Sequence, residues 1–301
     1  MTEKFYAPGE KGMEIAKKKA AEWESRKAAA PARQGPGKSL PLWPDAVRGV
    51  PNGMLRSALF GVIKKGSRRF MQGEQVAALE GIEIRYTGQQ LDQGDLDVWE
   101  SLLHVARVQK MGEQCRFTAY ALLKLMEKTD TGKNRETLQI RIERLRANAI
   151  NIKQGRYSYI GGLVDEAFRD DETREWVIGL NPKLHNLFGA DQFTQIEWTV
   201  RRTLDGQPLA QWLYGFYAGH AKPYPIKIET LHKLCGSEAT VMSDFAKTLR
   251  KGMDAVSKAC QAHDEGFGYN IRGDLVHVEK QPTIAQRRHL AKKIKKPRSA
   301  L

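Results

Sequence analysis

The chain has 301 residues, of which 41% are hydrophobic and 28% are charged, and its formal net charge is +14. A chain of this length can form one large domain or two ordinary ones, each with its own core. It contains no apolar run of the roughly 18–20 residues that cross a bilayer and no apolar N-terminal segment typical of a signal peptide, so we expect a cytoplasmic protein with no membrane partner. Cys115, Cys235 and Cys260 lack CxxC spacing, which argues against structural zinc and fits a reducing compartment.

The positive charge lies mainly at the two ends of the chain. Residues 1–38 carry nine basic and five acidic side chains, and residues 280–301 carry eight basic and no acidic ones. We interpret residues 1–38 as a flexible N-terminal tail. Residues 281–301 form a basic C-terminal tail that either attracts phosphates without sequence preference or is simply solvated. Because the middle of the chain is nearly neutral, a DNA-binding surface there requires segregated charge.

Periodic patterns begin after Pro44. Ile82 and Ile84 flank a polar residue ahead of a turn, which predicts a strand. Residues 95–109 are expected to form a helix capped by Asp95. The apolar residues at helical spacing in that segment are Leu96, Trp99, Leu102, Leu103 and Ala106.

The next segments predict a helix-turn-helix. A short helix at residues 118–126 is followed by a turn at residues 130–132 and by a longer helix from Asn134 to Ala149. In such units the second helix lies in the major groove of DNA and contacts base edges. We therefore expect the longer helix to be the reading helix.

After this helix the pattern changes from helical spacing to alternation. Residues 150–152 and 157–160 flank a four-residue turn that contains Gly155, which predicts a β-hairpin. A further strand is expected at residues 175–180, after an acidic turn. Helix, helix-turn-helix and hairpin in this order predict a winged helix.

The second half of the chain repeats this order. Its expected elements are a helix at 208–218, an extended segment at 224–228, a short helix at 229–235, a turn at 236–237, a long helix at 239–262, and a hairpin with strands 267–271 and 274–278 around residues 272–273. We therefore predict an α+β fold of two tandem winged-helix domains, each a helix-turn-helix plus a β-hairpin wing. The first is expected at residues 39–195 and the second at residues 196–280, with flexible basic tails.

Each long helix divides into an apolar and a polar stripe. The apolar stripe of the first helix, expected to be buried, comprises Leu138, Ile142, Leu145 and Ala149. The candidate DNA contacts of the first unit, on the helix and in the hairpin turn, are Lys133, Asn134, Arg135, Thr137, Arg141, Arg144, Asn148, Lys153 and Arg156. Arg, Asn and Thr at such spacing suit guanine, adenine, thymine methyl groups and phosphates.

In the second helix the expected buried stripe comprises Val241, Phe245, Leu249, Met253, Val256 and Cys260. The candidate DNA contacts of the second unit are Ser243, Lys247, Arg250, Lys251, Lys258 and Arg272. The first unit is expected to read bases, and the Lys-richer second unit to grip the backbone more than it reads. The alternative is that both are ordinary surface helices with solvated charge. Two such helices, each followed by a hairpin with a basic turn, favour DNA binding.

Catalytic signatures are absent from the sequence. No GxxxxGK[ST] loop supports nucleotide hydrolysis, and no HExxH or paired-His spacing supports a metal centre. The acidic segment of residues 165–172 is interpreted as a solvated turn. We therefore expect a binding protein that is not an enzyme, with no cofactor and no metal.

Several short segments together resemble TrfA-type plasmid replication initiators. They are Leu42-Trp43-Pro44-Asp45 with residues 54–60, Tyr86-Thr87-Gly88 with Trp99, residues 187–191 with Trp198, residues 223–230, Cys235-Gly236-Ser237, and Asp274-Leu275-Val276-His277. They span roughly residues 40–280. Each segment alone is weak, but their order is specific.

The resemblance implies a bacterial, plasmid-encoded initiator with two winged-helix domains. Such proteins bind tandem direct repeats (iterons) in double-stranded origin DNA, help to open the origin, and recruit the host initiator protein and the replicative helicase. They exchange between DNA-binding monomers and inactive homodimers that limit copy number. Longer members carry a sliding-clamp-binding peptide with Gln ahead of Leu-x-Leu-aromatic. Here Leu40, Leu42 and Trp43 keep the two Leu and the aromatic residue, but Ser39 replaces the Gln. This segment therefore either binds the clamp or anchors the tail on the first domain.

The leading hypothesis is thus an iteron-binding replication initiator. One alternative is a DNA-binding transcriptional repressor without initiator activity, and a minimal-origin plasmid that replicates after the gene is deleted would support it. A second alternative is an origin-nicking nuclease. Supercoiled origin DNA incubated with the protein and a divalent metal should stay intact if that alternative is wrong.

Overall fold

The computed structural model describes residues 39–294 except 64–65, 67, 109–112, 156 and 190. The described residues form one compact unit of mixed helix and sheet. The predicted N-terminal tail lies outside the described residues, as does the chain beyond residue 294. Within the described part of the chain, no helix is both long and apolar enough to cross a membrane.

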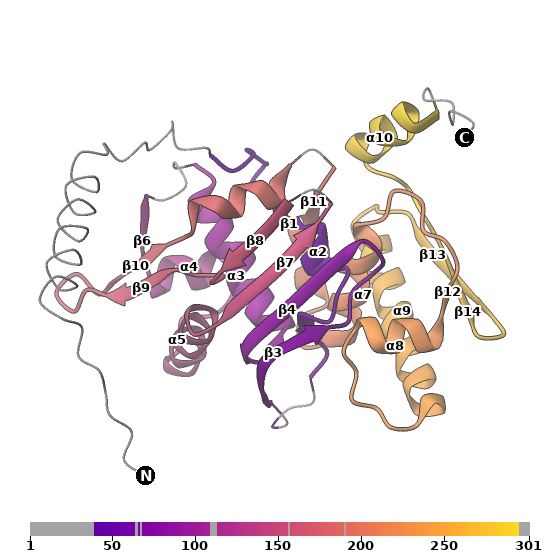
Figure 1. Ribbon diagram of the computed structural model, residues 1–301, viewed down its shortest axis with the longest axis horizontal. Coiled ribbons are helices and arrows are strands. Elements are labelled where there is room, and N and C mark those ends of the chain that lie inside the picture. The colour runs from indigo at the N-terminus through magenta and orange to yellow at the C-terminus, as the bar shows by residue number, and fades with distance from the viewer. Residues whose placement is uncertain are drawn as a thin grey trace, which may run out of the picture. The chain divides into compact units, whose positions relative to one another are not determined.

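The chain alternates between short strands and helices (Figure 1). Its first part contains β1 (Val47–Pro51), α2 (Asn52–Leu55), β2 (Phe60–Gly61), β3 (Phe70–Val76), β4 (Ile82–Gln89), β5 (Leu91–Asp92), α3 (Gln93–Ala106), β6 (Gln114–Thr118), α4 (Ala119–Leu125), α5 (Gly132–Arg146), β7 (Ala149–Gln154), β8 (Tyr157–Gly161), β9 (Glu166–Arg169), β10 (Glu175–Gly179) and the 3-10 helix η1 (Pro182–Phe188). Its second part contains β11 (Phe193–Glu197), α6 (Trp198–Thr203), α7 (Pro208–Ala218), β12 (Ile226–Lys227), α8 (Ile228–Leu234), α9 (Met242–Ala262), β13 (Phe267–Arg272), β14 (Leu275–Lys280) and α10 (Ile284–Ile294).

Two three-stranded sheets have the same topology. In the first, the strand order is β6-β10-β9, and in the second it is β12-β14-β13. In each case a strand leads into a short helix and a long helix, and the chain then returns as an antiparallel hairpin whose last strand pairs with the first strand. The repeat expected from the order of elements is therefore present in the strand pairing.

The hairpin at β7–β8 was predicted as a hairpin, but its place in the fold differs from the expectation. It pairs with β4, giving a four-stranded antiparallel sheet of order β3-β4-β7-β8, whereas β9–β10 is the hairpin that joins β6. The reason lies in the alternation. Ile150 and Ile152 are opposite Tyr86 and Ile84 and complete one buried face of this sheet.

The N-terminus of α3 begins earlier than expected. Its N-cap is Asp92, whose carboxylate accepts from the Asp95 backbone N–H at 2.9 Å, while the Asp95 carboxylate accepts from the Asp92 backbone N–H at 2.9 Å. This reciprocal pair is a capping box, so the expected cap, Asp95, is the N3 member of the pair. Asp95 is fully buried, and its carboxylate also forms ion pairs with arginines from other elements.

The core is continuous from the first part of the chain to the second. The indole Nε1 of Trp212 in α7 donates to the Ser57 carbonyl at 3.1 Å, and the backbone N–H of Val62 donates to the Cys235 carbonyl in the α8–α9 turn at 2.8 Å. The boundary predicted between residues 195 and 196 falls within β11, which pairs antiparallel with β1. Strand pairing and packing therefore join the two parts.

Part of the predicted flexible C-terminal tail is helical. Residues 284–294 form α10, whose first turn is capped by the Thr283 hydroxyl. The Gln286 amide donates to the Ala218 carbonyl at 2.7 Å, and His289 Nδ1 lies 2.9 Å from an Asp191 carboxylate oxygen. Good helix formers and these contacts explain why the tail is ordered here.

Candidate DNA-binding surfaces

Helix α5 is positioned by a cap at each end. Thr131 accepts from the Asn134 backbone N–H at 3.2 Å, and the Asn148 amide donates to the carbonyls of Arg144 and Leu145. The second contact satisfies carbonyls that the last turn leaves free. It also ends the helix before Ala149, which was expected on the buried stripe but lies exposed at the start of β7.

The apolar stripe of α5 is buried as predicted at Leu138, Ile142 and Leu145. The polar stripe displaced from it by one residue faces the protein more than the solvent. One residue is about 100° of helical rotation, so this stripe flanks the buried face and is not opposite to it. The opposite face is formed by exposed residues, namely Lys133, Glu136, Gln139, Ile140, Glu143 and Arg146.

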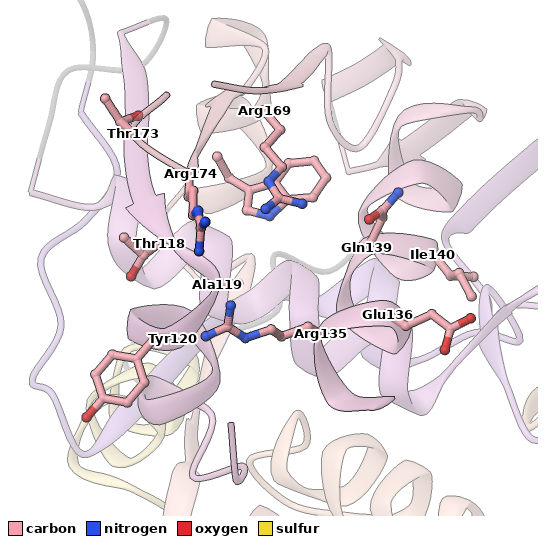
Figure 2. Close-up of a pocket in the computed structure, with 11 residues that line it drawn as sticks. Thr118, Ala119, Tyr120, Arg135, Glu136, Gln139, Ile140, Arg169, Thr173 and Arg174 are labelled. Atoms are coloured by element: carbon pink, nitrogen blue, oxygen red, sulfur yellow. The ribbon is translucent and has the colours of Figure 1, made fainter. Parts of the chain in front are cut away.

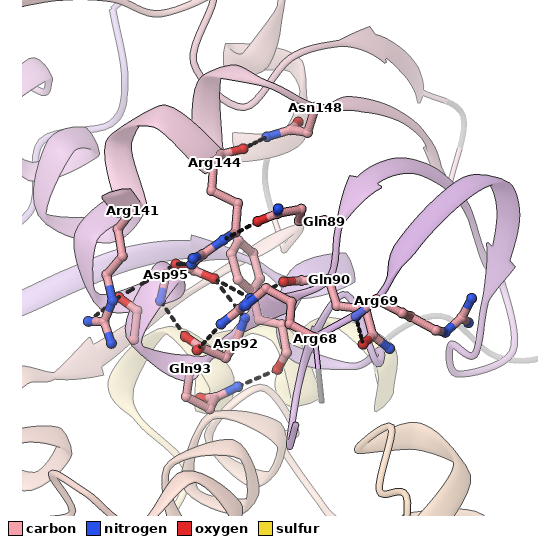
Figure 3. A network of polar contacts seen from close by, with 12 residues as sticks. Arg68, Arg69, Gln89, Gln90, Asp92, Gln93, Asp95, Arg141, Arg144 and Asn148 are labelled. Carbon is pink, nitrogen blue, oxygen red and sulfur yellow. Dashed lines mark hydrogen bonds and ion pairs between the residues drawn. The ribbon is translucent and has the colours of Figure 1, made fainter. Parts of the chain in front are cut away.

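Arg141 and Arg144 reach from α5 to the N-terminus of α3 (Figure 3). Arg144 Nη1 lies 2.5 Å from Asp95 Oδ1 and its side chain is 11% exposed, while Arg141 Nη1 donates to the Gly94 carbonyl at 3.0 Å. Arg68 contacts both Asp92 and Asp95. Burial raises the pKa of Asp95, with a further push from Asp92 and opposition from Arg144. These arginines hold α5 against α3.

The other candidate contacts on α5 are partly occupied by local hydrogen bonds. The Asn134 amide donates to the Thr129 carbonyl at 2.8 Å, and the Thr137 hydroxyl donates to the Lys133 carbonyl at 2.8 Å. Arg135 is exposed and forms a two-pronged ion pair with Asp130 at 2.6 Å. DNA contacts by these residues and by Asn148 stay a prediction.

A cleft of about 640 Å³ lies between α5 and the β9–β10 hairpin (Figure 2). Its lining residues are Thr118, Ala119, Tyr120, Arg135, Glu136, Gln139, Ile140, Arg169, Thr173, Arg174 and Trp176. Arg169 ends β9 and Arg174 directly precedes β10, so both flank the hairpin turn. Among the described residues neither has an ion-pair partner, and both are therefore free to meet an anion such as a DNA phosphate.

The hairpin turn that carries these arginines is fixed by its own acidic residue. Asp170 Oδ1 accepts from the backbone N–H groups of Glu172 and Thr173, at 2.9 and 3.1 Å. Arg174 follows with a positive φ of 58°, a conformation in which few non-glycine residues lie. The predicted solvated turn thus shapes the hairpin. Sequence reasoning missed Arg169 and Arg174 because it placed the wing at residues 150–160.

Helix α9 matches its predicted division more closely. Phe245, Leu249, Met253, Val256 and Cys260 are buried, and the predicted polar residues Ser243, Lys247, Arg250, Lys251 and Lys258 are all exposed. Val241, expected on the buried stripe, is the exposed N-cap, because the helix begins at Met242, three residues later than expected. Lys247 is paired with Asp244 at 3.1 Å, whereas Arg250, Lys251 and Lys258 have no ion pair within residues 39–294 as described.

The β13–β14 hairpin packs against α9. The Tyr269 hydroxyl donates to Asp254 Oδ1 at 2.6 Å, which fixes the hairpin beside the helix. Arg272 is exposed at the tip, next to Gly273, whose φ of 62° allows the tight turn. Arg272 ends β13 as Arg169 ends β9, so the two arginines occupy the same place at the turns of their hairpins.

Lys153 and Arg156 belong to a different part of the surface. Lys153 is exposed on β7 and lies 3.3 Å from a Glu83 carboxylate oxygen on the neighbouring strand β4. It is therefore on the four-stranded sheet and not on the hairpin beside α5. Arg156 lies outside the described residues.

The Leu40–Trp43 segment is docked onto the first part of the chain. Leu40 and Trp43 are buried, and Leu42 is 76% exposed. The Trp43 ring stacks on Phe188 at 6.0 Å between centroids, and its indole Nε1 donates to His104 Nδ1 at 3.1 Å. These contacts favour the anchoring interpretation, since a clamp-binding peptide needs its apolar side chains accessible.

In the portion of the chain that the structure describes, no group of three or more His, Cys, Asp or Glu side chains could hold a metal ion. Beside the carboxylates of Glu136, Glu143, Asp244 and Asp254, the exposed faces of the two long helices carry amines, guanidinium groups, amides and hydroxyls. This set suits phosphate contacts and base-edge hydrogen bonds.

Comparisons with known proteins agree with this arrangement. The family model described as "TrfA protein" matches residues 16–280. A curated relative, the plasmid replication initiator protein TrfA of Escherichia coli, is 28% identical over 249 residues, which cover 79% of this chain and 63% of the relative. The chain thus spans less than two thirds of that relative's length. The crystal structure of domains 2 and 3 of RctB aligns with a TM-score of 0.53 at 13% identity, covers 77% of this chain and 98% of that one, and shows similarity of fold.

Proposed function

Because the chain belongs to the TrfA family of plasmid replication initiators, we propose that it binds tandem direct repeats in its plasmid origin with two heads. Each head is one β–α–α–β–β unit, which we interpret as a winged helix: α4, α5 and β9–β10 in the first, α8, α9 and β13–β14 in the second. The observation that carries the proposal is the duplicated sheet topology, β6-β10-β9 and β12-β14-β13. In each unit it places a long helix with exposed cationic side chains beside a hairpin that carries arginine at its turn.

In the first head, the exposed face of α5 enters the major groove. Gln139 suits a bidentate contact with adenine, and Lys133 and Arg146 suit phosphates or guanine. Arg169 and Arg174 then hold the backbone from the far side of the cleft. Arg135 contributes once a phosphate replaces Asp130 as its partner.

In the second head, Arg250 is the candidate base reader on α9. Ser243, Lys247, Lys251 and Lys258 flank it on the exposed face, and Arg272 holds phosphates from the hairpin tip. Two reading helices in one chain predict a repeat whose two subsites are contacted on successive major grooves.

The family resemblance supports the rest of the proposed role, in which the bound protein assists origin opening and recruits the host initiator protein and helicase. Self-association to a homodimer would limit its activity. Binding itself needs no enzymatic step. Clamp binding through residues 40–43 would require Leu40 and Trp43 to leave the core, so we assign this segment to anchoring.

The test is a binding assay on DNA flanking the gene. Footprinting should show protection of direct repeats, and the affinity for one repeat should exceed that for scrambled DNA by the roughly 10³-fold or more typical of specific binders. A minimal plasmid carrying the origin should then require the gene for replication. Protection without a replication requirement would support a repressor, and equal affinity for both DNAs would contradict the proposal.

A further inference from the structure

Helix α6 is the element that contacts both proposed heads. It spans only Trp198–Thr203 between β11 and α7. Arg201 on α6 reaches α3, and Asp205, just beyond α6, forms an ion pair with Lys128 in the α4–α5 turn. On its other side, the Thr203 hydroxyl lies 3.0 Å from His263 Nε2 at the end of α9. A six-residue helix thus connects the turn of one helix-turn-helix to the reading helix of the other.

The contact with α3 is a buried ionic cluster. Arg201 Nε lies 2.7 Å from Asp97 Oδ1 and 2.6 Å from Glu100 Oε1, and all three side chains are at most 3% exposed. Arg201 Nη2 also donates to the Gln93 carbonyl at 3.1 Å. Two carboxylates face one guanidinium, and burial raises the pKa of Glu100 to about 7 against the opposing effect of Arg201.

The cluster continues into both heads. On the first side, the first turn of α3 also carries Asp95, which receives Arg144 from α5 (Figure 3). On the second side, the Gln211 amide of α7 lies 3.5 Å from Asp97 Oδ2. Helix α7 packs closely on α9, where a Cβ added to Gly252 would lie 3.1 Å from Leu213 Cδ1. A series of directional contacts therefore runs from α5 through α3 and α6 to α7, and apolar packing joins α7 to α9.

Directional contacts constrain geometry differently from apolar packing. Replacing a buried ion pair by apolar side chains of similar volume is often neutral for stability or stabilising, so such a cluster need not exist for stability alone. A guanidinium held by two carboxylates and a carbonyl fixes rotation and sliding between α3 and α6. Rotation and sliding at this junction would change the separation of the two reading helices.

We propose that the Arg201–Asp97–Glu100 cluster sets the distance and rotation between the two reading helices, so that the chain selects DNA by the spacing of two subsites as well as by their bases. The inference rests on the proposed function. Inserting one base pair between the subsites rotates one against the other by about 34° and moves it by about 3.4 Å. A rigid pair of heads cannot follow such a change without losing contacts.

The experiment measures affinity for duplexes that carry the footprinted repeat with zero, one or two base pairs inserted or deleted between its two subsites. The variant Arg201→Met/Asp97→Asn/Glu100→Gln removes every charge of the cluster with little change in volume. The control Arg69→Met/Glu74→Gln removes an exposed ion pair within one sheet, where Arg69 Nη1 lies 2.6 Å from Glu74 Oε1. All proteins are first compared by thermal unfolding.

When the spacing changes by one base pair, the affinity of wild type and of the control should fall about tenfold or more. The affinity of the cluster variant should fall less than about threefold, and this variant should still prefer the repeat over scrambled DNA. If the triple variant does not fold, Glu100→Gln replaces it and should relax the spacing preference part of the way. A folded variant with the wild-type spacing preference would overturn the inference, as would a wild type indifferent to spacing. A chain that protects no repeat would instead refute the proposed function.

Discussion

Removing Arg169 and Arg174 should change how DNA binding depends on salt. Both flank the turn of the β9–β10 hairpin at the cleft, and neither has an ion-pair partner among the residues that the structure describes. If each neutralises one phosphate, each contributes about 0.9 to the slope of log K against log salt concentration. The Arg169→Ala/Arg174→Ala variant should therefore have a slope shallower by about 1.8.

The size of the effect follows from the slope. A fourfold rise in salt, from about 50 to about 200 mM, weakens binding about 3.5-fold for each phosphate contact. Over this salt range, the affinity of a variant without both contacts should therefore fall about 12-fold less than the affinity of wild type. The reduction should be the same on repeat and scrambled DNA, because phosphate contacts carry no direct sequence information.

Fluorescence anisotropy with labelled duplexes across that salt range measures the slope directly. Arg85→Ala is the control, because Arg85 is exposed on β4 of the four-stranded sheet and has the same charge. Single variants of Arg169 and Arg174 should each lower the slope by about half of the double effect. A double variant with the wild-type slope, or an Arg85→Ala variant with an equally reduced slope, would show that the cleft does not hold the DNA backbone.

Three further predictions concern single residues. Arg250→Ala should weaken repeat binding by about 1–3 kcal/mol and relax the preference at one base position; selection from randomised repeats measures this, and uniform loss on all sequences would make Arg250 a phosphate contact. Arg144→Ala should lower the free energy of unfolding by about 3 kcal/mol, because it removes a partner from the buried Asp95; unchanged urea unfolding would contradict that. Burial lowers the pKa of His220 from 6.5 to about 4, so the stability from neutral His220 is present above pH 6.5 and is lost as the pH falls toward 4. The advantage of wild type over His220→Asn should shrink by about 2 kcal/mol between about pH 7 and pH 5, and a constant difference would show that His220 does not take part.

Local patterns predicted most elements, and pairing between distant segments explains what they missed. Apolar residues at steps of three and four located α5 and α9, and alternation located the hairpins. Alternation cannot say which strand a hairpin joins, so β7–β8 was taken for the wing although it completes the sheet with β4. The Arg201 cluster was invisible for the same reason, because Arg201 and Asp97 are 104 positions apart. One signal in the sequence could have indicated the cluster. Arg201 lies on the same buried side of α6 as Trp198 and Val200.

The inward direction of Arg141 and Arg144 keeps the division of labour expected for the two heads, but it weakens the first head's own hold on DNA. Without them, the exposed face of α5 carries Glu136 and Glu143 beside its cationic residues, so its own attraction to DNA is weak and depends on the arginines of the neighbouring hairpin. The exposed face of α9 has more cationic residues than acidic ones. Since electrostatic attraction to phosphates supplies most non-specific affinity, the second head should hold DNA first. The first head then adds discrimination only on repeats whose spacing lets α5 reach its groove.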